Sequence, residues 1–449
     1  MERIRAWVGG YLKALSSPGL PGLRQRVVNG VSWTFTGAVI GRTVSLVGII
    51  VATRMLPANA FGKLSAVQLL VTTCAGVAGL GLGVAVTKRI AECRAREPER
   101  VWDYASAATK IVLVSGVVGT VAVFVGRGWL ATDWLHDAAL SHSITLASAM
   151  VLTSSLFAVQ IGILTGFEAF KESAFATSAR SILTAVLLVV GILLAGLNGG
   201  LLGYLMGEAV ATTWAMVVVF RLGGADARPV FRLGRSAPGT WRSLRKIGIP
   251  AVGASAAILL SLLIGQRMLT ELPNGFVAVA QFSVAYRWSL VVLFVPAALA
   301  PVMLPLLANL AGAGEHGAFR RLLRGNLLIL SLITAVPALI MILARGPILG
   351  LSGAAYRSDP LPFVVLIAAT IPVAWNAILS QAAVALEAIS AWLISDLALA
   401  ATLVASASLL IPRYRSTGLA VAYLLGYAAT CVVLMLPVRS RLRALGSVA

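Results

Sequence analysis

Charged residues are scarce in this chain of 449 residues, where they make up 12% of the sequence. An ordinary soluble domain contains about 25%. The acids are the scarcest of them, since 16 aspartates and glutamates stand against 36 lysines and arginines. Hydrophobic residues make up 59% of the chain, and its mean hydropathy is +0.92. These values exclude an ordinary soluble protein and predict a membrane protein.

Metal-binding and nucleotide-binding motifs are absent. The three cysteines, Cys74, Cys93 and Cys431, are scattered and form no CxxC pair, and the three histidines fall in predicted loops without metal-ligand spacing. We therefore expect neither a disulfide framework nor a metal site. The sequence has no G-x-x-x-x-G-K-[ST] loop, so we expect no nucleotide hydrolysis by the chain itself and no cofactor.

Apolar runs recur along the whole chain, and each is long enough to cross the hydrocarbon core, roughly 30 Å thick, as a helix. Helices are predicted because unpaired backbone groups cannot lie in lipid, and the alternating pattern of barrel strands is absent. The predicted loops outside the cytoplasm are short, which leaves no room for a catalytic domain, so transport fits better than catalysis. We predict an all-α protein with about twelve spans, at 28–54, 64–87, 107–126, 143–166, 177–195, 199–220, 247–268, 276–307, 326–349, 361–385, 389–411 and 417–437.

The basic residues gather in alternate loops. This is the positive-inside rule, which places both termini in the cytoplasm and explains the net charge of +20 without nucleic acid as a partner. The basic linker divides two six-helix lobes, and an axis along the membrane normal is expected to relate them. The predicted organisation is a basic, amphipathic tail at 1–27, an amino-terminal lobe at 28–220, the linker at 221–246, a carboxyl-terminal lobe at 247–437 and a cytoplasmic tail at 438–449.

The two halves carry a faint repeat. Each contains an Arg-Met-Leu step, a glycine eight residues after the arginine, and a glutamine six residues later. The offset between the two copies is 213 positions (267 − 54), close to half of the chain. Hydrophobic segments that repeat by halves are typical of transporters, which handle the transported species between the halves. The matched pairs are Arg54 and Arg267, Gly62 and Gly275, and Gln68 and Gln281.

Two arginines fall inside predicted spans. Arg42 and Arg287 each stand about twelve residues from the start of a span, which is roughly 18 Å along a helix and close to the bilayer midplane. A guanidinium at that depth costs at least ~2.5 kcal/mol, so each is expected to face a wet cavity or an anionic partner. One interpretation is a central cavity that receives a phosphate-bearing headgroup, because the planar guanidinium binds phosphate with paired hydrogen bonds. The other is a structural ion pair with a buried acid, Glu208 or Asp396.

Other polar residues in the spans have two interpretations each. Arg54 and Arg267 can extend to the interface as isolated basic residues do, or form a positive ring at the outer mouth. Glu208 and Asp396 can bind a coupling proton or sodium ion, or neutralise the arginines. Gly37 and Gly41 form a GxxxG step, which predicts close helix packing. Four side chains are candidate sugar contacts, although helix packing is the more common role: Gln68, Tyr286, Gln281 and Asn376.

The beginning of the chain resembles the polysaccharide-biosynthesis transporters, the Wzx-type O-antigen flippases and their relatives. The matching features are the Asn-Gly-Val-Ser-Trp stretch at 29–33, the Arg-Met-Leu-Pro turn at 54–57, Phe-Gly at 61–62, and the basic pair Lys88 and Arg89 that closes the second span. Weaker likenesses follow along the membrane-spanning chain. The lipid II flippases of the same superfamily usually have fourteen helices, which argues against that branch.

The resemblance implies membership of the multidrug/oligosaccharidyl-lipid/polysaccharide (MOP) exporter superfamily. It implies two six-helix bundles around a central cavity, alternating access, and residence in the bacterial inner membrane. The implied partners are a polyprenyl-diphosphate-linked glycan as substrate, membrane lipids, and other proteins of envelope-glycan assembly. The expected function is a flippase that moves the undecaprenyl-diphosphate-linked unit from the inner to the outer leaflet, with coupling to H⁺ or Na⁺ left open. The alternative is a cation-coupled multidrug exporter of the MATE type.

Overall fold

The computed structural model describes residues 23–223, 239–386 and 388–446. The predicted tail at 1–27 and the predicted linker at 221–246 lie largely outside these ranges. The described chain is helical almost throughout, as predicted, and contains no strand in these ranges. Helices satisfy their own backbone hydrogen bonds, which is what a chain this apolar needs in lipid.

Helices of the amino-terminal half are α2 (Leu23–Met55), α3 (Ala58–Ala78), α4 (Leu82–Arg96), α5 (Val101–Val125), α6 (Arg127–Trp129), α7 (Leu140–Ser148), α8 (Met150–Gly166) and α9 (Phe170–Gly223), with short turns η1 (Pro98–Arg100) and η2 (Leu130–Trp134). Helices of the carboxyl-terminal half are α10 (Thr240–Thr270), α11 (Gly275–Val292), α12 (Phe294–Gly312), α13 (His316–Leu343), α14 (Arg345–Ser352), α15 (Ala354–Arg357), α16 (Leu361–Ala385) and α17 (Ile389–Gly446). Within the described residues, 9 helices are long and apolar enough to cross a membrane, so the chain is a multi-pass membrane protein.

Two of these helices, α9 and α17, are hairpins. In α9 the helical backbone is interrupted at Ala195 and at Gly196, whose φ of 58° suits a glycine. The chain then runs back along itself. The close approach of the two segments is shown at Gly203, where a Cβ would clash with the carbonyl oxygen of Leu187. In α17 the interruption is at Arg415, and a Cβ on Gly418 would lie 2.6 Å from the backbone of Leu410. Each hairpin therefore contains two antiparallel segments, at 170–194 and 197–223 and at 389–414 and 416–446.

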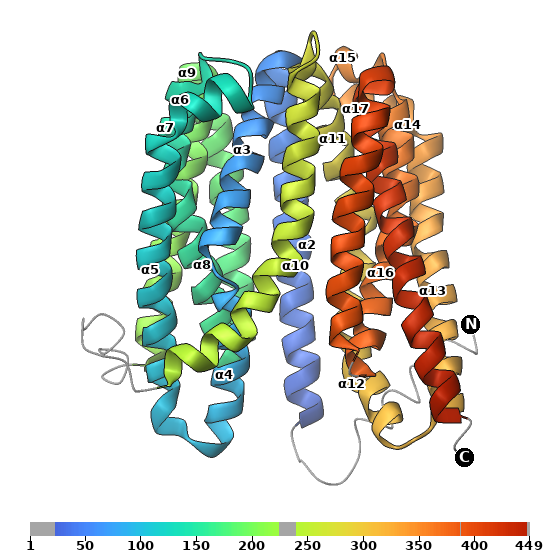
Figure 1. Ribbon diagram of the computed structural model, residues 1–449. Coiled ribbons are helices and arrows are strands. Elements are labelled where there is room, and N and C mark those ends of the chain that lie inside the picture. Colours follow the sequence, from blue (N-terminus) through green and yellow to red (C-terminus); the bar gives the residue numbers. More distant parts are fainter. Residues whose placement is uncertain (1–22, 224–238, 387, 447–449) are drawn as a thin grey trace.

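The two halves stand side by side, with α2, α10 and α11 between them (Figure 1). The lower end in Figure 1 is the end where α2 begins and α17 finishes, and the upper end holds the turns of the two hairpins. Helix α10 crosses between the halves. Its Leu244 packs in a core of the amino-terminal half, whereas a Cβ on its Gly265 would clash with Leu419 of α17.

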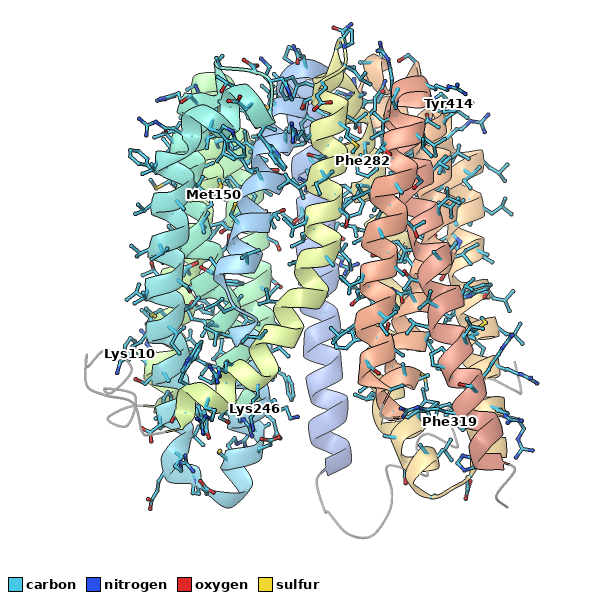
Figure 2. All side chains as sticks on the ribbon, in the orientation of Figure 1. Lys110, Met150, Lys246, Phe282, Phe319 and Tyr414 are labelled. Atoms are coloured by element: carbon cyan, nitrogen blue, oxygen red, sulfur yellow. The ribbon has the colours of Figure 1, made fainter. Side chains whose placement is uncertain are left out.

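The apolar core is shared at the upper end and divided at the lower end. One cluster joins both halves and includes Met150 and Phe282, both labelled in Figure 2. Towards the lower end the halves have separate cores. That of the amino-terminal half contains Ile90 and Tyr104, and that of the carboxyl-terminal half contains Phe319, which Figure 2 labels near the bottom. The halves are therefore packed together above and packed independently below.

Candidate functional site

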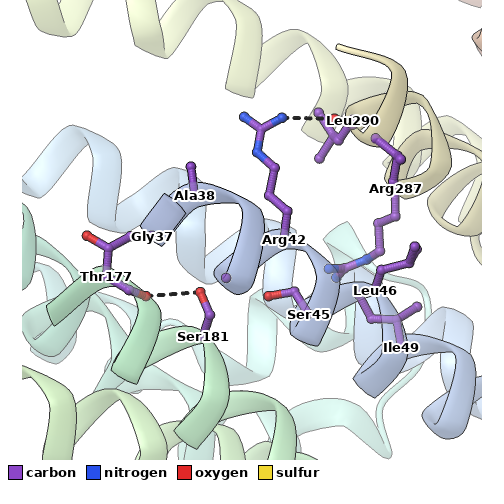
Figure 3. A pocket seen from close by; sticks show the side chains of 12 residues that line it. Gly37, Ala38, Arg42, Ser45, Leu46, Ile49, Thr177, Ser181, Arg287 and Leu290 are labelled. Carbon is purple, nitrogen blue, oxygen red and sulfur yellow. Dashed lines mark hydrogen bonds between the residues drawn. The ribbon is translucent and has the colours of Figure 1, made fainter. Parts of the chain in front are cut away.

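Arg42 and Arg287 line the same cavity, at the boundary between the two halves (Figure 3). Its volume is about 430 Å³, and its walls come from α2, α9 and α11. Three hydroxyl side chains, Ser45, Thr177 and Ser181, accompany the arginines, and the remaining lining is apolar or glycine. The two arginines, which lie 245 positions apart in the sequence (287 − 42), are thus brought together by the fold.

Arg42 is held by the broken helix opposite. Its Nη1 donates a hydrogen bond of 2.9 Å to the carbonyl oxygen of Leu290, and its guanidinium lies 5.4 Å from the ring centroid of Phe294. Helix α11 ends at Val292 and α12 begins at Phe294, so Leu290 belongs to the last turn of α11. Carbonyls of a last turn have no partner within their own helix. The break therefore supplies the acceptor that orients Arg42.

Arg287 is held by a neutral side chain. Its Nη2 donates a hydrogen bond of 3.1 Å to the Oε1 atom of Gln68, which α3 supplies from the other half. Among the described residues, no carboxylate forms an ion pair with Arg287 or with Arg42. Both positive charges are therefore uncompensated by acids in the part of the chain that the structure describes.

Glu208 is paired elsewhere. It is 1% exposed, and its carboxylate accepts hydrogen bonds from the Arg180 guanidinium and from the hydroxyls of Ser154 and Thr153. The distance from Arg180 Nε to the carboxylate oxygen is 3.0 Å. Arg180 lies near the start of the predicted span at 177–195, where the positive-inside rule favours a place at the cytoplasmic end, but it stands ten residues into α9 and pairs across the hairpin. The glycines at 191–203 are the available signal for a hairpin, and its turn at Ala195–Gly196 brings position 180 within about one helical turn of position 208.

Asp396 is the second buried acid of the spans, and it is 5% exposed. It lies in the first segment of α17, in the carboxyl-terminal half, and takes part in no ion pair among the described side chains. No group of three or more His, Cys, Asp or Glu residues within the described ranges is arranged to hold a metal ion.

The candidate sugar contacts do not line the arginine cavity. Gln68 accepts the hydrogen bond from Arg287, and Gln281 accepts one of 3.0 Å from the Ser416 hydroxyl. Tyr286 packs edge-on against Tyr423, with 5.9 Å between ring centroids, in the shared core. The Asn376 Oδ1 atom accepts a hydrogen bond of 3.3 Å from Ser380. Of the four, Gln68 is the one whose side chain forms a hydrogen bond with the side chain of a cavity residue among the described residues.

The repeated arginines lie at the upper end, where each contacts the opposite half. Arg54 Nε donates a hydrogen bond of 2.7 Å to the carbonyl oxygen of Leu351, in the last turn of α14. Arg267 lies 4.8 Å from the ring centroid of Trp134, and its Nε is 3.5 Å from the carboxylate of Glu271. The Arg54–Leu351 contact and the Arg267–Trp134 contact join the two halves.

Lys63 adds a third contact between the halves at the same end. Its Nζ is 2.5 Å from a carboxylate oxygen of Asp137 and 5.5 Å from the ring centroid of Phe276. Glu271 also lies 3.9 Å from the imidazole of His136. Asp137, His136 and Glu271 could not be predicted as partners, because they lie in short connecting segments without periodic patterning.

A family described as "Polysaccharide biosynthesis protein" matches residues 27–311. None of the curated protein sequences matches the chain significantly. The chain is similar to the inward-facing structure of a multidrug resistance MATE family transporter of the MOP superfamily, at 15% identity and a TM-score of 0.81, covering 91% of this chain and 99% of that one.

Two further structures are similar. The outward-facing structure of a multidrug resistance MATE family transporter of the MOP superfamily is 15% identical, with a TM-score of 0.68 and coverage of 93% and 96%. A MOP superfamily transporter from Pyrococcus furiosus is 16% identical, with a TM-score of 0.69 and the same coverage. Its description states that a reverse polarity of the binding pocket suggests a different function. At these identities the likeness establishes a common MATE-like fold.

Proposed function

The chain belongs to the polysaccharide biosynthesis protein family and has a MATE-like fold, and from this premise we propose that it is a flippase for a lipid-linked glycan. Its substrate is a polyprenyl-diphosphate-linked oligosaccharide or polysaccharide repeat unit, moved from the inner to the outer leaflet of the bacterial cytoplasmic membrane. Family and fold are those of a transporter and not of an enzyme. The observation that carries the substrate class is the pair of arginines, without a carboxylate partner in the described chain, that lines one cavity.

The arginine cavity suits a diphosphate. Burying a charge without a partner is costly, and removing one partner of a buried pair typically destabilises a protein by about 3–5 kcal/mol. Among the described residues, a carbonyl oxygen and an amide oxygen accept from the guanidinium groups, so most of their donors remain for an anion. Arginine donors match phosphate oxygens in paired geometry. Ser45, Thr177 and Ser181 supply neutral hydroxyls beside them.

We propose that the chain crosses the membrane twelve times, in two six-helix lobes. The nine candidate helices give eleven crossings when the two hairpins are counted as pairs, and α10, which has a shorter apolar stretch, gives the twelfth. The amino-terminal lobe is then 28–220 and the carboxyl-terminal lobe 247–437. The lower end is the cytoplasmic one, because most basic residues lie towards it.

We propose that the described state opens to the cytoplasm. Its core is shared at the upper end and divided at the lower end. The greater similarity to the inward-facing MATE structure than to the outward-facing one, with TM-scores of 0.81 and 0.68, supports the same state. In this state the diphosphate enters from below and binds Arg42 and Arg287. Separation of the contacts of Arg54, Arg267 and Lys63 then accompanies opening to the outside.

The membrane potential favours this direction of transport. With the cytoplasm negative, outward movement of each negative charge gains ~2.3 kcal/mol per 100 mV. Glu208 is less suited than Asp396 to bind a coupling cation, because Arg180 already neutralises it. Asp396 therefore remains the candidate for coupling to H⁺ or Na⁺.

The test is a leaflet assay in vesicles with a labelled polyprenyl-diphosphate sugar. We expect Arg42→Ala and Arg287→Ala each to abolish flipping while the protein remains folded in the membrane. Arg413→Ala is the matched control, because Arg413 is exposed and does not line the cavity. Full activity of both cavity variants would refute the proposal.

The alternative, a cation-coupled multidrug exporter, draws its support from the similarity to MATE structures. The two arginines argue against it, because a positive cavity repels cationic drugs. The same vesicles decide between the functions. If the vesicles take up cationic dyes and an added polyprenyl diphosphate does not inhibit this uptake, the exporter is favoured.

A further inference from the structure

An apolar groove lies along the same contact of α2 with α9 as the arginine cavity. Its volume is about 440 Å³, and α2 contributes Thr36, Gly37 and Ile40 to its walls. Its α9 residues run from Lys171 to Leu183. Lys171 and Ser178 are polar, and the other α9 residues of the groove are apolar. Gly37 lines both the groove and the arginine cavity, so the two spaces lie on either side of the α2–α9 contact at this residue.

The seam between the two spaces is tight. A Cβ on Gly37 would lie 2.9 Å from the Cβ of Ala174, and one on Gly41 would lie 2.9 Å from the Ser181 hydroxyl. Ser178 donates a hydrogen bond of 3.0 Å to the carbonyl oxygen of Gly37. The close packing predicted from the GxxxG step is thereby confirmed. Towards the upper end the seam keeps the groove apart from the cavity.

The groove has the length and position of a lipid chain of one leaflet. From Lys171 to Leu183 is twelve helical steps, or about 18 Å, and one leaflet contributes about half of the 30 Å hydrocarbon core. Its rim includes Phe175, which is 61% exposed, so the groove faces the bilayer. Lys171 lies at its lower end, near the start of α9, and is exposed. A positive charge at the end of an apolar groove is complementary to a chain that begins at an anionic headgroup.

We propose that this groove binds the polyprenyl tail of the substrate next to its diphosphate, while the diphosphate occupies the arginine cavity. This inference rests on the proposed function, and it places the tail along α9 rather than freely in the lipid. Because the seam is closed at Gly37, the tail passes below it, where α9 begins at Phe170. Because lipid tails are as apolar as the groove, burial alone gives an ordinary lipid no preference for it. The substrate's tail is favoured because its bound head raises its effective concentration there.

Photocrosslinking tests the location. A photoreactive residue replaces Ala179 inside the groove, and the matched control replaces Leu328, which is 68% exposed on α13 of the other lobe. The full-length protein in nanodiscs receives either a radiolabelled polyprenyl-diphosphate sugar or a radiolabelled anionic phospholipid. We expect several-fold more polyprenyl adduct at position 179 than at position 328, and no such ratio for the phospholipid. Equal polyprenyl adducts at the two positions, or the same ratio for both lipids, would overturn the tail site.

A large side chain placed in the groove tests whether the tail site is needed for flipping. We expect Ala179→Trp to slow flipping several-fold, with binding of a tail-free nucleoside-diphosphate sugar unchanged, whereas Leu328→Trp keeps the wild-type rate. Ala179→Trp with wild-type flipping would overturn the proposal. If the variant fails to fold, the crosslinking ratio still decides. Failure of the flippase function itself is distinguishable, because the wild-type protein would then flip no labelled lipid.

Discussion

Arg54 and Arg267 hold equivalent positions in the two halves and contact the opposite half in opposite directions. Arg54 of α2 donates to carbonyl oxygens at the end of α14, and Arg267 of α10 lies against the ring of Trp134. Each lobe thus supplies one arginine and receives one at the upper end. The repeat in the sequence marks a pair of reciprocal contacts that hold the lobes together in the described state.

Removing either reciprocal contact is predicted to favour the outward-facing state. A cation–π contact at an exposed site contributes about 0.5–1 kcal/mol, so Arg267→Ala should shift the equilibrium roughly two- to five-fold. Arg54→Ala should act in the same direction. The measurement is the distance between spin labels at the upper ends of the lobes. Arg345→Ala is the control, since the hydrogen bond of this exposed arginine in the described chain is to the carbonyl oxygen of Ile342, in its own half. Unchanged distance distributions in the double variant would contradict the role of the two arginines.

A carboxylate at Gln68 is predicted to inactivate the transporter. The Gln68 amide oxygen already accepts from Arg287 at 3.1 Å, so Gln68→Glu places a negative charge on that guanidinium. A hydrogen bond to a charged group contributes about 1.5–3 kcal/mol, so competition with the diphosphate should lower flipping tenfold or more. Gln281→Glu is the matched control at the equivalent position, where the partner is Ser416. Equal flipping rates for the two variants would show that Arg287 does not bind substrate.

The Arg180–Glu208 pair is predicted to stabilise the amino-terminal lobe. Removing one partner of a buried ion pair costs about 3–5 kcal/mol, and Arg180 is 30% exposed, so we expect the lower end of that range. Thermal unfolding in detergent should show a large fall in Tm for Glu208→Gln and Arg180→Ala. The double variant should lose less than the sum of the two. Additive losses would mean that the pair is not coupled.

Asp396 is predicted to behave differently from Glu208. Asp396 forms no ion pair with a basic side chain among the described residues. Asp396→Asn should therefore leave the Tm nearly unchanged. If transport depends on H⁺ or Na⁺, we expect this substitution to remove the dependence and Glu208→Gln to retain it. Flipping rates in vesicles with imposed pH and Na⁺ gradients provide the measurement. A dependence that persists in Asp396→Asn would exclude this carboxylate as the coupling site.

Much of the fold follows from sequence because hydropathy is a local property. The helical class and the multi-pass character follow from the apolar runs, and the hairpin turns at Ala195–Gly196 and Arg415 fall between predicted spans. The helix broken at Leu293 has Pro296 just beyond the break, and a proline lacks the N–H that would continue the helix. The expected depth of Arg42 and Arg287 rests on the helical rise alone, and it stays a prediction.

Contacts between distant segments could not be predicted in the same way. The partner of Arg42 is a backbone carbonyl, which every residue has, so no side-chain pattern announces it. The partner of Arg267 is Trp134, in a short π-helical turn without periodicity. The positive-inside rule favours a cytoplasmic place for Arg180, which is near the start of a predicted span, and only the hairpin geometry shows its pairing with Glu208.

Helix α10 is fastened at one end to each lobe, through Leu244 below and Gly265 above. If the lobes rotate relative to one another between the proposed inward- and outward-facing states, we expect α10 either to bend or to release one of these attachments. Pro250 lies between the two attachments and has no N–H to close the preceding turn, which makes that turn the softest part of the helix. The stiffness of α10 is then expected to limit how far and how fast the two lobes move relative to one another.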